Sequence, residues 1–334
     1  MTIYLDNLNF TKEFPSIITP KYNISNQVDF IDIIKINKCK IEQILLQYGA
    51  ILFRGFPVNN SKEFSNFIKV LNLGKFVDYI GGDSPRDKVD DGVYTSTEAP
   101  PSFYIPLHQE LSFIKHHPRH IYFYCEIPPL IGGETIIADA RKVYKDLNSN
   151  LIDKFEKKGL TYISRYYYKS RVMSLINRFR RSHKSWIEVF ETNDKKDVEK
   201  KCKANEFEWR WLKNDWLEIK QHRPAICNHL LTNDTVWFNQ AHLYDFNPRL
   251  LGLKNYIGAS LLYMNKDTKL HEIEFSDGNP IPRKDLYNVF DTLKNNTVAF
   301  PWQKRDLLIL DNILSMHGRA SFNGKRRVLT ALTT

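Results

Sequence analysis

The chain has few cysteines, and they form no pattern. Of its 334 residues only four are cysteine, namely Cys39, Cys125, Cys202 and Cys227, and no Cys-x-x-Cys pair occurs. Cysteines paired at short spacing are typical of structural zinc sites and thiol redox centres, so neither is predicted. Scattered, unpaired cysteines fit a reducing compartment, and we therefore expect a cytoplasmic protein.

Long apolar runs are also missing. No stretch approaches the roughly eighteen consecutive apolar residues that a membrane-spanning helix needs. The first residues carry Asp6, Lys12 and Glu13 and no apolar segment, so we expect neither a secretory leader nor a membrane partner. The sequence shows no internal repeat and no low-complexity tract. Because all-β barrels and sandwiches often exceed about 200 residues as one domain, a single domain over residues 1–334 is predicted.

Positive charge is in excess, by ten at neutral pH. Most of it lies in residues 165–223, which hold 16 Lys and Arg against 9 Asp and Glu. A nucleic acid, an acidic protein partner, or a lysine-rich composition with no partner would each explain such a segment. The signs alternate along Asp194-Lys195-Lys196-Asp197, which suits a solvated helix face better than a phosphate groove. We interpret 165–223 as a basic helical insertion and expect no nucleic-acid partner.

Short segments rich in β-branched and aromatic residues recur in both halves of the chain, and residues 1–37 are expected to form an irregular arm. Helical periodicity and capping residues predict helices at 39–48, 61–73, 140–147, 151–158, 171–190, 194–204, 255–264 and 282–293. Strands are predicted at 50–54, 121–126, 134–138, 208–212, 216–220, 225–228, 235–238, 298–300, 307–310 and 326–332. Strands from both halves around one centre predict a mainly β sandwich or jelly roll with peripheral helices.

The stretch 79–104 is rich in Gly, Pro, Asp and Ser and has no periodicity. A long loop of this kind is usually functional or disordered. It runs directly into His108, so we interpret it as a lid over an active site. Glu98 would meet a substrate amine if the lid closes; the alternative is an exposed loop carboxylate.

A candidate metal site begins at His108-Gln109-Glu110. In an extended chain residues two apart point to the same face, so His108 and Glu110 can bind one metal ion together. His317, which lies 207 residues after Glu110, would complete the set. Two imidazoles and one carboxylate form the facial triad of non-haem Fe(II) oxygenases. The His-x-Glu spacing alone is weak evidence for a metal site, because a histidine and a glutamate on the surface near a turn can have the same spacing.

Several further sequence blocks occur in the same order as in a known protein family, and they support the interpretation of His108, Glu110 and His317 as metal ligands. With them the sequence resembles the TauD/TfdA family of Fe(II)- and 2-oxoglutarate-dependent dioxygenases, and within it the clavaminate-synthase-like branch near syringomycin-type amino-acid hydroxylases. The resemblance covers most of the chain and rests on Phe53-Arg54-Gly55-Phe56, Thr95-Ser96-Thr97-Glu98, the block around His108, Gly132-Gly133-Glu134-Thr135, Val236-Trp237-Phe238-Asn239-Gln240-Ala241-His242, Asp277-Gly278-Asn279-Pro280-Ile281, Phe300-Pro301-Trp302-Gln303 and the segment from His317 to Arg327.

The resemblance implies a double-stranded β-helix (jelly-roll) core, Fe(II) held by His108, Glu110 and His317, and O2 and 2-oxoglutarate as co-substrates. The far carboxylate of 2-oxoglutarate then needs a fixed cation and a hydroxyl, and an arginine suits it because its planar fork gives two parallel hydrogen bonds. Arg327 matches the family's arginine and Thr135 its threonine. Arg326, on the opposite strand face, and Arg319 are the neighbouring alternatives.

The resemblance also bears on the reaction and the substrate. Related halogenases carry a small residue where this chain has Glu110, so hydroxylation or desaturation is expected here. Asn239 and Gln240 could hydrogen-bond a substrate, while His242, a rival metal ligand by position, is interpreted as structural. Sulfonate-binding members carry another arginine four residues after the co-substrate arginine; this chain has Ala331 there, which argues against a sulfonate.

Two hypotheses of different class follow. The first is an oxygenase that hydroxylates an amino acid, free or tethered to an acidic carrier protein, in specialised-metabolite biosynthesis; desaturation, or oxidation of a peptide or betaine, is the variant with the same chemistry. The second is a non-catalytic, basic binding protein on the same fold. The presence of all three ligands and an arginine favours the enzyme.

Overall fold

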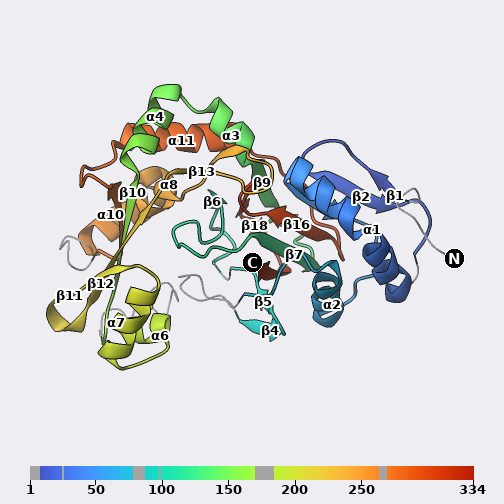
Figure 1. Ribbon diagram of the computed structural model, residues 1–334, viewed down its shortest axis with the longest axis horizontal. Coiled ribbons are helices and arrows are strands. Elements are labelled where there is room, and N and C mark those ends of the chain that lie inside the picture. The colour runs from blue at the N-terminus through green and yellow to red at the C-terminus, as the bar shows by residue number, and fades with distance from the viewer. Residues whose placement is uncertain (1–7, 25, 78–86, 98, 170–183, 263–268) are drawn as a thin grey trace.

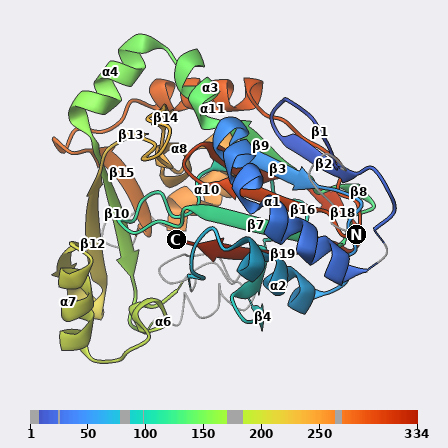
Figure 2. The same cartoon turned by 45° about the vertical axis from the view of Figure 1, so that its right-hand side comes forward.

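A large mixed sheet forms one layer of the protein (Figure 1). The computed structural model describes residues 8–24, 26–77, 87–97, 99–169, 184–262 and 269–334. In spatial order the eight strands of this sheet are β1 (Leu8–Phe10), β2 (Ser16–Pro20), β3 (Ala50–Phe53), β16 (Leu307–Asp311), β7 (His120–Ile127), β19 (Arg327–Thr333), β5 (Val93–Thr95) and β4 (Lys88–Asp90). At its centre β7 pairs with β16 on one side and with β19 on the other (Figure 2).

A second, smaller sheet packs against the large one. It contains β6 (Ile105–His108), β17 (Ser315–Arg319) and β9 (Thr135–Asp139) in that order. Ile137 of β9 belongs to the same buried apolar cluster as Ile121 of β7 and Leu310 of β16, so the two sheets share one core. The strand expected at 298–300 is reduced to a single bridge between Val298 and Ile137. The predicted mainly β core is therefore present as two facing layers.

Two helices cover the outer face of the large sheet. α1 (Gln27–Tyr48) and α2 (Ser61–Leu71) bury their apolar faces in a cluster that includes Tyr122 and Leu329. The expectation of an irregular arm over 1–37 is wrong within the described residues, because α1 begins at Gln27, where the Asn26 side chain caps it through Asp29 N–H. Within the described part of the chain, no helix is long and apolar enough to cross a membrane.

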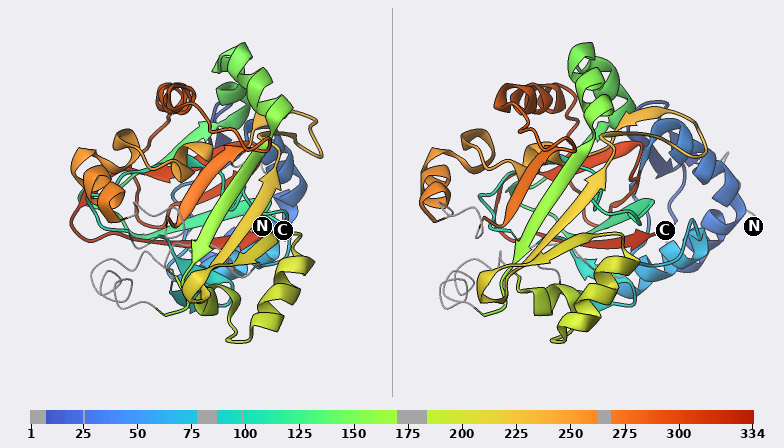
Figure 3. Two further views of the ribbon diagram at one scale, coloured as in Figure 1. Left: turned by 90° about the vertical axis from the view of Figure 1, so that its left-hand side faces the viewer. Right: turned by 60° about the vertical axis from the view of Figure 1, so that its left-hand side comes forward.

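A second body of structure lies beside the core, and its long strands run side by side in Figure 3. Its sheet contains β11 (Glu208–Trp211), β12 (Leu217–Arg223), β10 (Leu160–Tyr166) and β15 (His271–Phe275). The insertion expected at 165–223 is thus partly strand; its described helices are α6 (Trp186–Phe190) and α7 (Lys195–Ala204), and 170–183 lies outside the described residues. Arg165 of β10 forms ion pairs with buried Glu218 of β12 (2.8 Å) and with Glu272 of β15 (2.5 Å), which link the three strands.

The remaining elements surround these two bodies. The helices α3 (Ala140–Asp146), α4 (Ser149–Lys158) and α11 (Arg283–Asn295) lie together at one end of the molecule in Figure 1. The other short elements are α8 (Ala241–Tyr244), α9 (Pro248–Leu251), α10 (Leu253–Leu262), the 3-10 turn Lys213–Asp215, and the strand pairs β13 (Ile226–Asn228) with β14 (Thr235–Trp237) and β8 (Ile131–Gly132) with β18 (Phe322–Asn323).

Candidate metal centre

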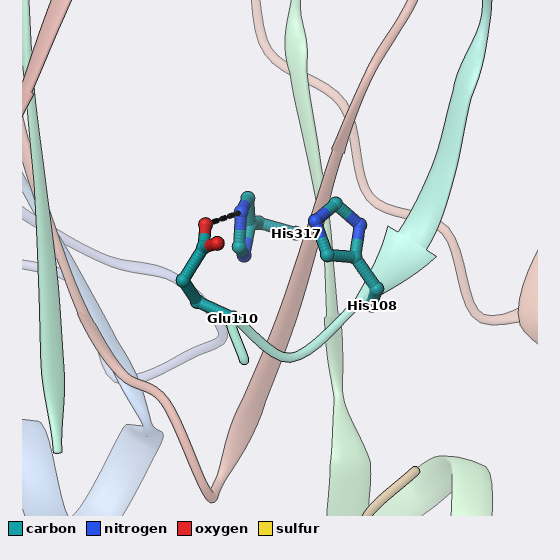
Figure 4. A group of neighbouring side chains, drawn as sticks. All are labelled: His108, Glu110 and His317. Atoms are coloured by element: carbon teal, nitrogen blue, oxygen red, sulfur yellow. Dashed lines mark ion pairs between the residues drawn. The ribbon is translucent and has the colours of Figure 1, made fainter. Parts of the chain in front are cut away.

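Three side chains from two neighbouring strands converge at the small sheet. His108 ends β6 and lies opposite His317 of β17, with 4.4 Å between their ring centroids. Glu110 follows β6 and places Oε2 3.5 Å from Nε2 of His317 (Figure 4). One ligand atom from each residue lies within 4.8 Å of the others. The structure therefore brings together the predicted His108, Glu110 and His317, although Glu110 reaches the site from a turn after the strand and not from an extended segment.

The local chemistry fits a divalent metal ion. The Nδ1 of His108 lies 2.8 Å from the carbonyl of Pro106. This contact fixes Nδ1 as the protonated nitrogen and leaves Nε2 for a metal, the usual arrangement of a ligand histidine. Withdrawal from water, and then the neighbouring His317, lower the pKa of His108 to about 3, which keeps the ring neutral. The Nδ1 of His317 is buried with no hydrogen-bond partner among the described residues.

Asn312, which the sequence argument missed, holds Glu110 in place. Its Oδ1 accepts the Glu110 N–H at 2.7 Å, and its Nδ2 donates to the Glu110 carbonyl at 2.9 Å and to the Pro118 carbonyl at 2.8 Å. The turn that carries Asn312 is fixed by Asp311, whose Oδ1 accepts the N–H groups of the two residues after Asn312. An Asp-Asn pair at a strand end was the only sequence signal for this turn.

A buried histidine supports the same turn. The Nε2 of His229 lies 3.1 Å from Oδ2 of Asp311, and both side chains are about 1% exposed. Thr232 donates its backbone N–H to Nδ1 of His229, so Nε2 carries the proton and donates to the carboxylate. Despite its burial, Asp311 has a pKa below the usual range; desolvation raises it, and the hydrogen bonds donated by His229 and by the Leu314 N–H outweigh that effect. The turn before His317 thus rests on a buried ionised carboxylate.

Asn239 and Gln240 lie behind the metal centre and bind backbone. The Gln240 side chain donates to the Gln109 carbonyl at 2.5 Å, and Asn239 donates to the Ala225 carbonyl at 2.8 Å. Both side chains are buried. That they contact substrate stays a prediction; in this structure their amide donors bind backbone carbonyls. The Nε2 of His242 donates a hydrogen bond to the Leu107 carbonyl at 2.8 Å, which agrees with the structural role expected of this histidine.

A small cavity of about 30 Å³ extends from the two histidines into the core. Thr135, the threonine predicted to bind the co-substrate, lines it together with Phe123 and Thr330 of the large sheet. Arg326 closes its far side, donating from Nε to the Gly133 carbonyl at 2.9 Å and from Nη1 to Ser96 Oγ at 3.3 Å. Burial, and then the nearby charge of Arg319, lower the pKa of Arg326 to about 10, so it stays a cation at neutral pH.

The structure moves the candidate co-substrate cation from Arg327 to Arg326. Arg327 does not line the cavity; its side chain is 47% exposed, and its Nε pairs with Oε2 of Glu126 at 2.8 Å. Adjacent residues of a strand point to opposite faces, and the inner face here carries Arg326, Val328 and Thr330. Arg327 stays the prediction from motif position, and the geometry of the cavity favours its neighbour Arg326 as the candidate.

The predicted lid is only partly a loop. Residues 88–95 form the hairpin β4–β5, which extends the edge of the large sheet. Beyond the hairpin, Arg319 donates to the carbonyls of Thr97, Ala99, Pro100 and Phe103 at 2.8 to 3.3 Å, which ties this segment to the strand that carries His317. Glu98, the expected substrate carboxylate, lies outside the described residues, as do 79–86.

Comparisons with known proteins identify the family. Residues 18–333 match the family described as taurine catabolism dioxygenase TauD, TfdA family, and the chain belongs to it. It is 34% identical over 292 residues to the dapdiamide synthesis protein DdaC of Enterobacter agglomerans, covering 87% of this chain and 84% of that protein. It is 30% identical over 332 residues to a clavaminate synthase-like protein of Arabidopsis thaliana, covering 96% and 94% of the two chains.

Solved structures show the same fold. PvcB of Pseudomonas aeruginosa gives a TM-score of 0.53 at 11% identity, covering 98% of this chain and 90% of that one. AAD-2, solved with Mn(II) and N-oxalylglycine, gives 0.53 at 12% identity, covering 98% and 96%. The predicted jelly-roll core is thereby confirmed. By its family the protein is a non-haem oxygenase that depends on Fe(II) and 2-oxoglutarate.

Proposed function

We propose that this enzyme hydroxylates an unactivated C–H bond of an amino acid, free or carried on a protein, in specialised-metabolite biosynthesis. The observation that carries the proposal is the complete triad of His108, Glu110 and His317 beside an arginine-bounded cavity. DdaC, a relative named for dapdiamide synthesis, supports the biosynthetic setting.

The described residues have distinct tasks in this reaction. His108, Glu110 and His317 would hold the iron, and Arg326 with Thr135 would bind the far carboxylate of 2-oxoglutarate. When bound, iron and 2-oxoglutarate use O2 to oxidise a C–H bond while 2-oxoglutarate becomes succinate and CO2. Phe123 and Thr330 line the space between the metal ligands and Arg326, so they limit the water that can reach it.

Glu110 supports hydroxylation over halogenation. Its carboxylate would take a coordination position that a halide would otherwise need, and Asn312 fixes the backbone from which it extends. Desaturation uses the same protein ligands and is the alternative outcome. The products of the two reactions differ by mass, which makes them separable in one assay.

An apolar cavity of about 620 Å³ is the candidate substrate site. Its size is within the usual range for small-molecule pockets. On one side lie Leu111 and Phe113, one and three residues after Glu110, and on the other Tyr166 and Phe190 of the second body. Gln221 contributes a buried Oε1 with no hydrogen-bond partner among the described residues. An acceptor of this kind suits an ammonium or amide N–H, and the apolar walls suit an aliphatic side chain.

A more specific version of this proposal is that an acidic carrier protein docks at the basic insertion, residues 165–223. α7 borders the cavity through Lys201 and is rich in lysine, which gives a cationic rim. Several of these charges already have acidic neighbours, including Lys201 with Asp197 at 3.2 Å and Lys195 with Asp215 at 2.5 Å. Free and carrier-bound substrates are therefore both included in the test.

The test is succinate formation from 2-oxoglutarate with Fe(II) and O2 across amino acids, each offered free and loaded on a carrier protein. The proposal expects one substrate to stimulate turnover and to gain one oxygen atom, with Glu110→Ala inactive. A product lighter by two hydrogens would replace hydroxylation with desaturation. Absence of any substrate-stimulated turnover in an enzyme that binds Fe(II) and 2-oxoglutarate would overturn the amino-acid proposal.

A further inference from the structure

A second cavity, of about 480 Å³, adjoins the small cavity beside the two histidines. We call it the vestibule; its lining includes Ser96, Arg319, Phe322, Lys325, Arg326 and Arg327. Ser96, Arg319 and Arg326 also line the small cavity beside the histidines, so these residues form a common wall between the two spaces. The apolar cavity that begins at Leu111 has neither Arg326 nor Thr135 in its lining.

The vestibule is strongly cationic. The guanidinium groups of Arg319 and Arg326 lie 5.2 and 5.7 Å from the ring centroid of Phe322. Within the part of the chain that the structure describes, they donate hydrogen bonds to backbone carbonyls and to Ser96 Oγ, which are neutral acceptors. Lys325 stands exposed at the rim. Arg327, by contrast, is neutralised by Glu126.

We propose that the vestibule is the port through which 2-oxoglutarate reaches the metal centre and succinate leaves it. The inference rests on the proposed role of Arg326 as the cation for the far carboxylate. Arg326 lines both the vestibule and the small cavity. Its guanidinium therefore contacts 2-oxoglutarate in the vestibule before the keto-acid end of that molecule enters the small cavity. The organic substrate then uses the separate apolar cavity, and neither ligand has to leave for the other to bind.

Electrostatics gives the port a kinetic role. A cleft lined by charges of one sign focuses its field and raises the association rate of an oppositely charged ligand, and added salt screens the effect. Lys325 is exposed and lies one residue before Arg326. It can therefore attract the 2-oxoglutarate dianion without contacting it in the final binding site. Its removal should therefore slow association and leave dissociation unchanged. A residue of the final binding site would change dissociation instead.

The test compares Lys325→Glu with Lys284→Glu. Lys284 is exposed on α11 and does not line the vestibule, and the control makes the same change in net charge. Stopped-flow absorbance of the charge-transfer band that forms when 2-oxoglutarate chelates Fe(II), recorded without O2, gives the association rate constant. The port predicts a decrease of about threefold or more for Lys325→Glu at low salt, smaller at high salt, and no change for Lys284→Glu.

Obstruction tests passage separately from attraction. In a Cys39→Ser background, which removes the exposed cysteine, Lys325→Cys would be labelled with a bulky maleimide and compared with labelled Lys284→Cys. The port predicts that only the label at position 325 slows association. Equal association rates in both pairs would overturn the port, as would an effect confined to dissociation. Equilibrium titration of Arg326→Gln reports independently on the proposed function, because that variant should lose affinity whichever route the ligand takes.

Discussion

Asn312 brackets the backbone of Glu110, accepting its N–H at 2.7 Å and donating to its carbonyl at 2.9 Å. The two residues are 202 positions apart, and Asn312 belongs to the turn that leads into the strand of His317. One amide side chain thus sets the position of the carboxylate ligand relative to the second histidine. The ligand set depends on this turn as much as on the ligands themselves.

Asn312→Ala should weaken metal binding. The change leaves buried backbone groups of Glu110 and Pro118 unpaired, each at a cost of about 1–3 kcal/mol. Loss of a group that orients a metal ligand typically lowers metal affinity by about 10–100-fold. Calorimetric titration with Mn(II) measures this. Asn296→Ala is the matched control, since Asn296 is also a buried amide but bonds Asp146 and Thr292 at a distance from the site in the fold. Unchanged affinity in Asn312→Ala would contradict the role.

Arg326→Gln and Arg327→Gln should have different effects on co-substrate binding. Removing one partner of a buried charge pair costs about 2–5 kcal/mol, which corresponds to a loss of about 30-fold or more in affinity. The loss is expected for Arg326, which borders the cavity, and not for Arg327, which pairs with Glu126. Titration of 2-oxoglutarate into the Mn(II)-loaded protein distinguishes them, and the opposite ranking would restore Arg327.

Arg327 was predicted from its position in the family motif, which does not say which of two adjacent arginines faces the core. Arg326 and Arg327 are adjacent, and which one faces the core depends on how β19 pairs with β7. That pairing has a register irregularity between Arg327 and Val328. The irregularity arises from both strands, so no local pattern around the arginines encodes it. The metal-binding triad, in contrast, could be predicted from the sequence because further family motifs accompany its spacing.

Tertiary packing also overrode local propensity in α1. Its first half contains Ile31, Ile33 and Ile34, and β-branched residues lower helix propensity. These isoleucines are buried against the large sheet, which compensates for that preference. Most strands of the core were predictable because their composition and their environment agree. The backbone contacts of Asn239 and Gln240 could not be predicted, because the carbonyls that they bind come from distant parts of the chain.

Gln240→Leu should lower stability without altering substrate choice. The variant removes the donor to the buried Gln109 carbonyl, and an unpaired buried acceptor costs about 1–3 kcal/mol. Urea denaturation measures the loss, and the substrate panel measures selectivity. A changed substrate preference at unchanged stability would show that Gln240 contacts substrate after all.

The metal-free protein should lose stability as pH falls from 6.5 towards 4, in part through His242. Burial lowers the pKa of this histidine from 6.5 to about 4. In that window the unfolded chain binds a proton that the folded chain excludes, so protonation favours unfolding, by up to about 3 kcal/mol at the lower end. Above the unfolded pKa the penalty is absent. His242→Gln, which keeps a donor for the Leu107 carbonyl, should flatten the pH dependence of the unfolding free energy; an unchanged slope would contradict it.

A crystal structure with Mn(II) and N-oxalylglycine, an analogue of 2-oxoglutarate, tests the central claim most directly. The account predicts one metal ion bound by His108, Glu110 and His317, with the far carboxylate of the analogue on Arg326 and the hydroxyl of Thr135. A metal ion bound by other residues, or a carboxylate held by Arg327 outside the core, would contradict it.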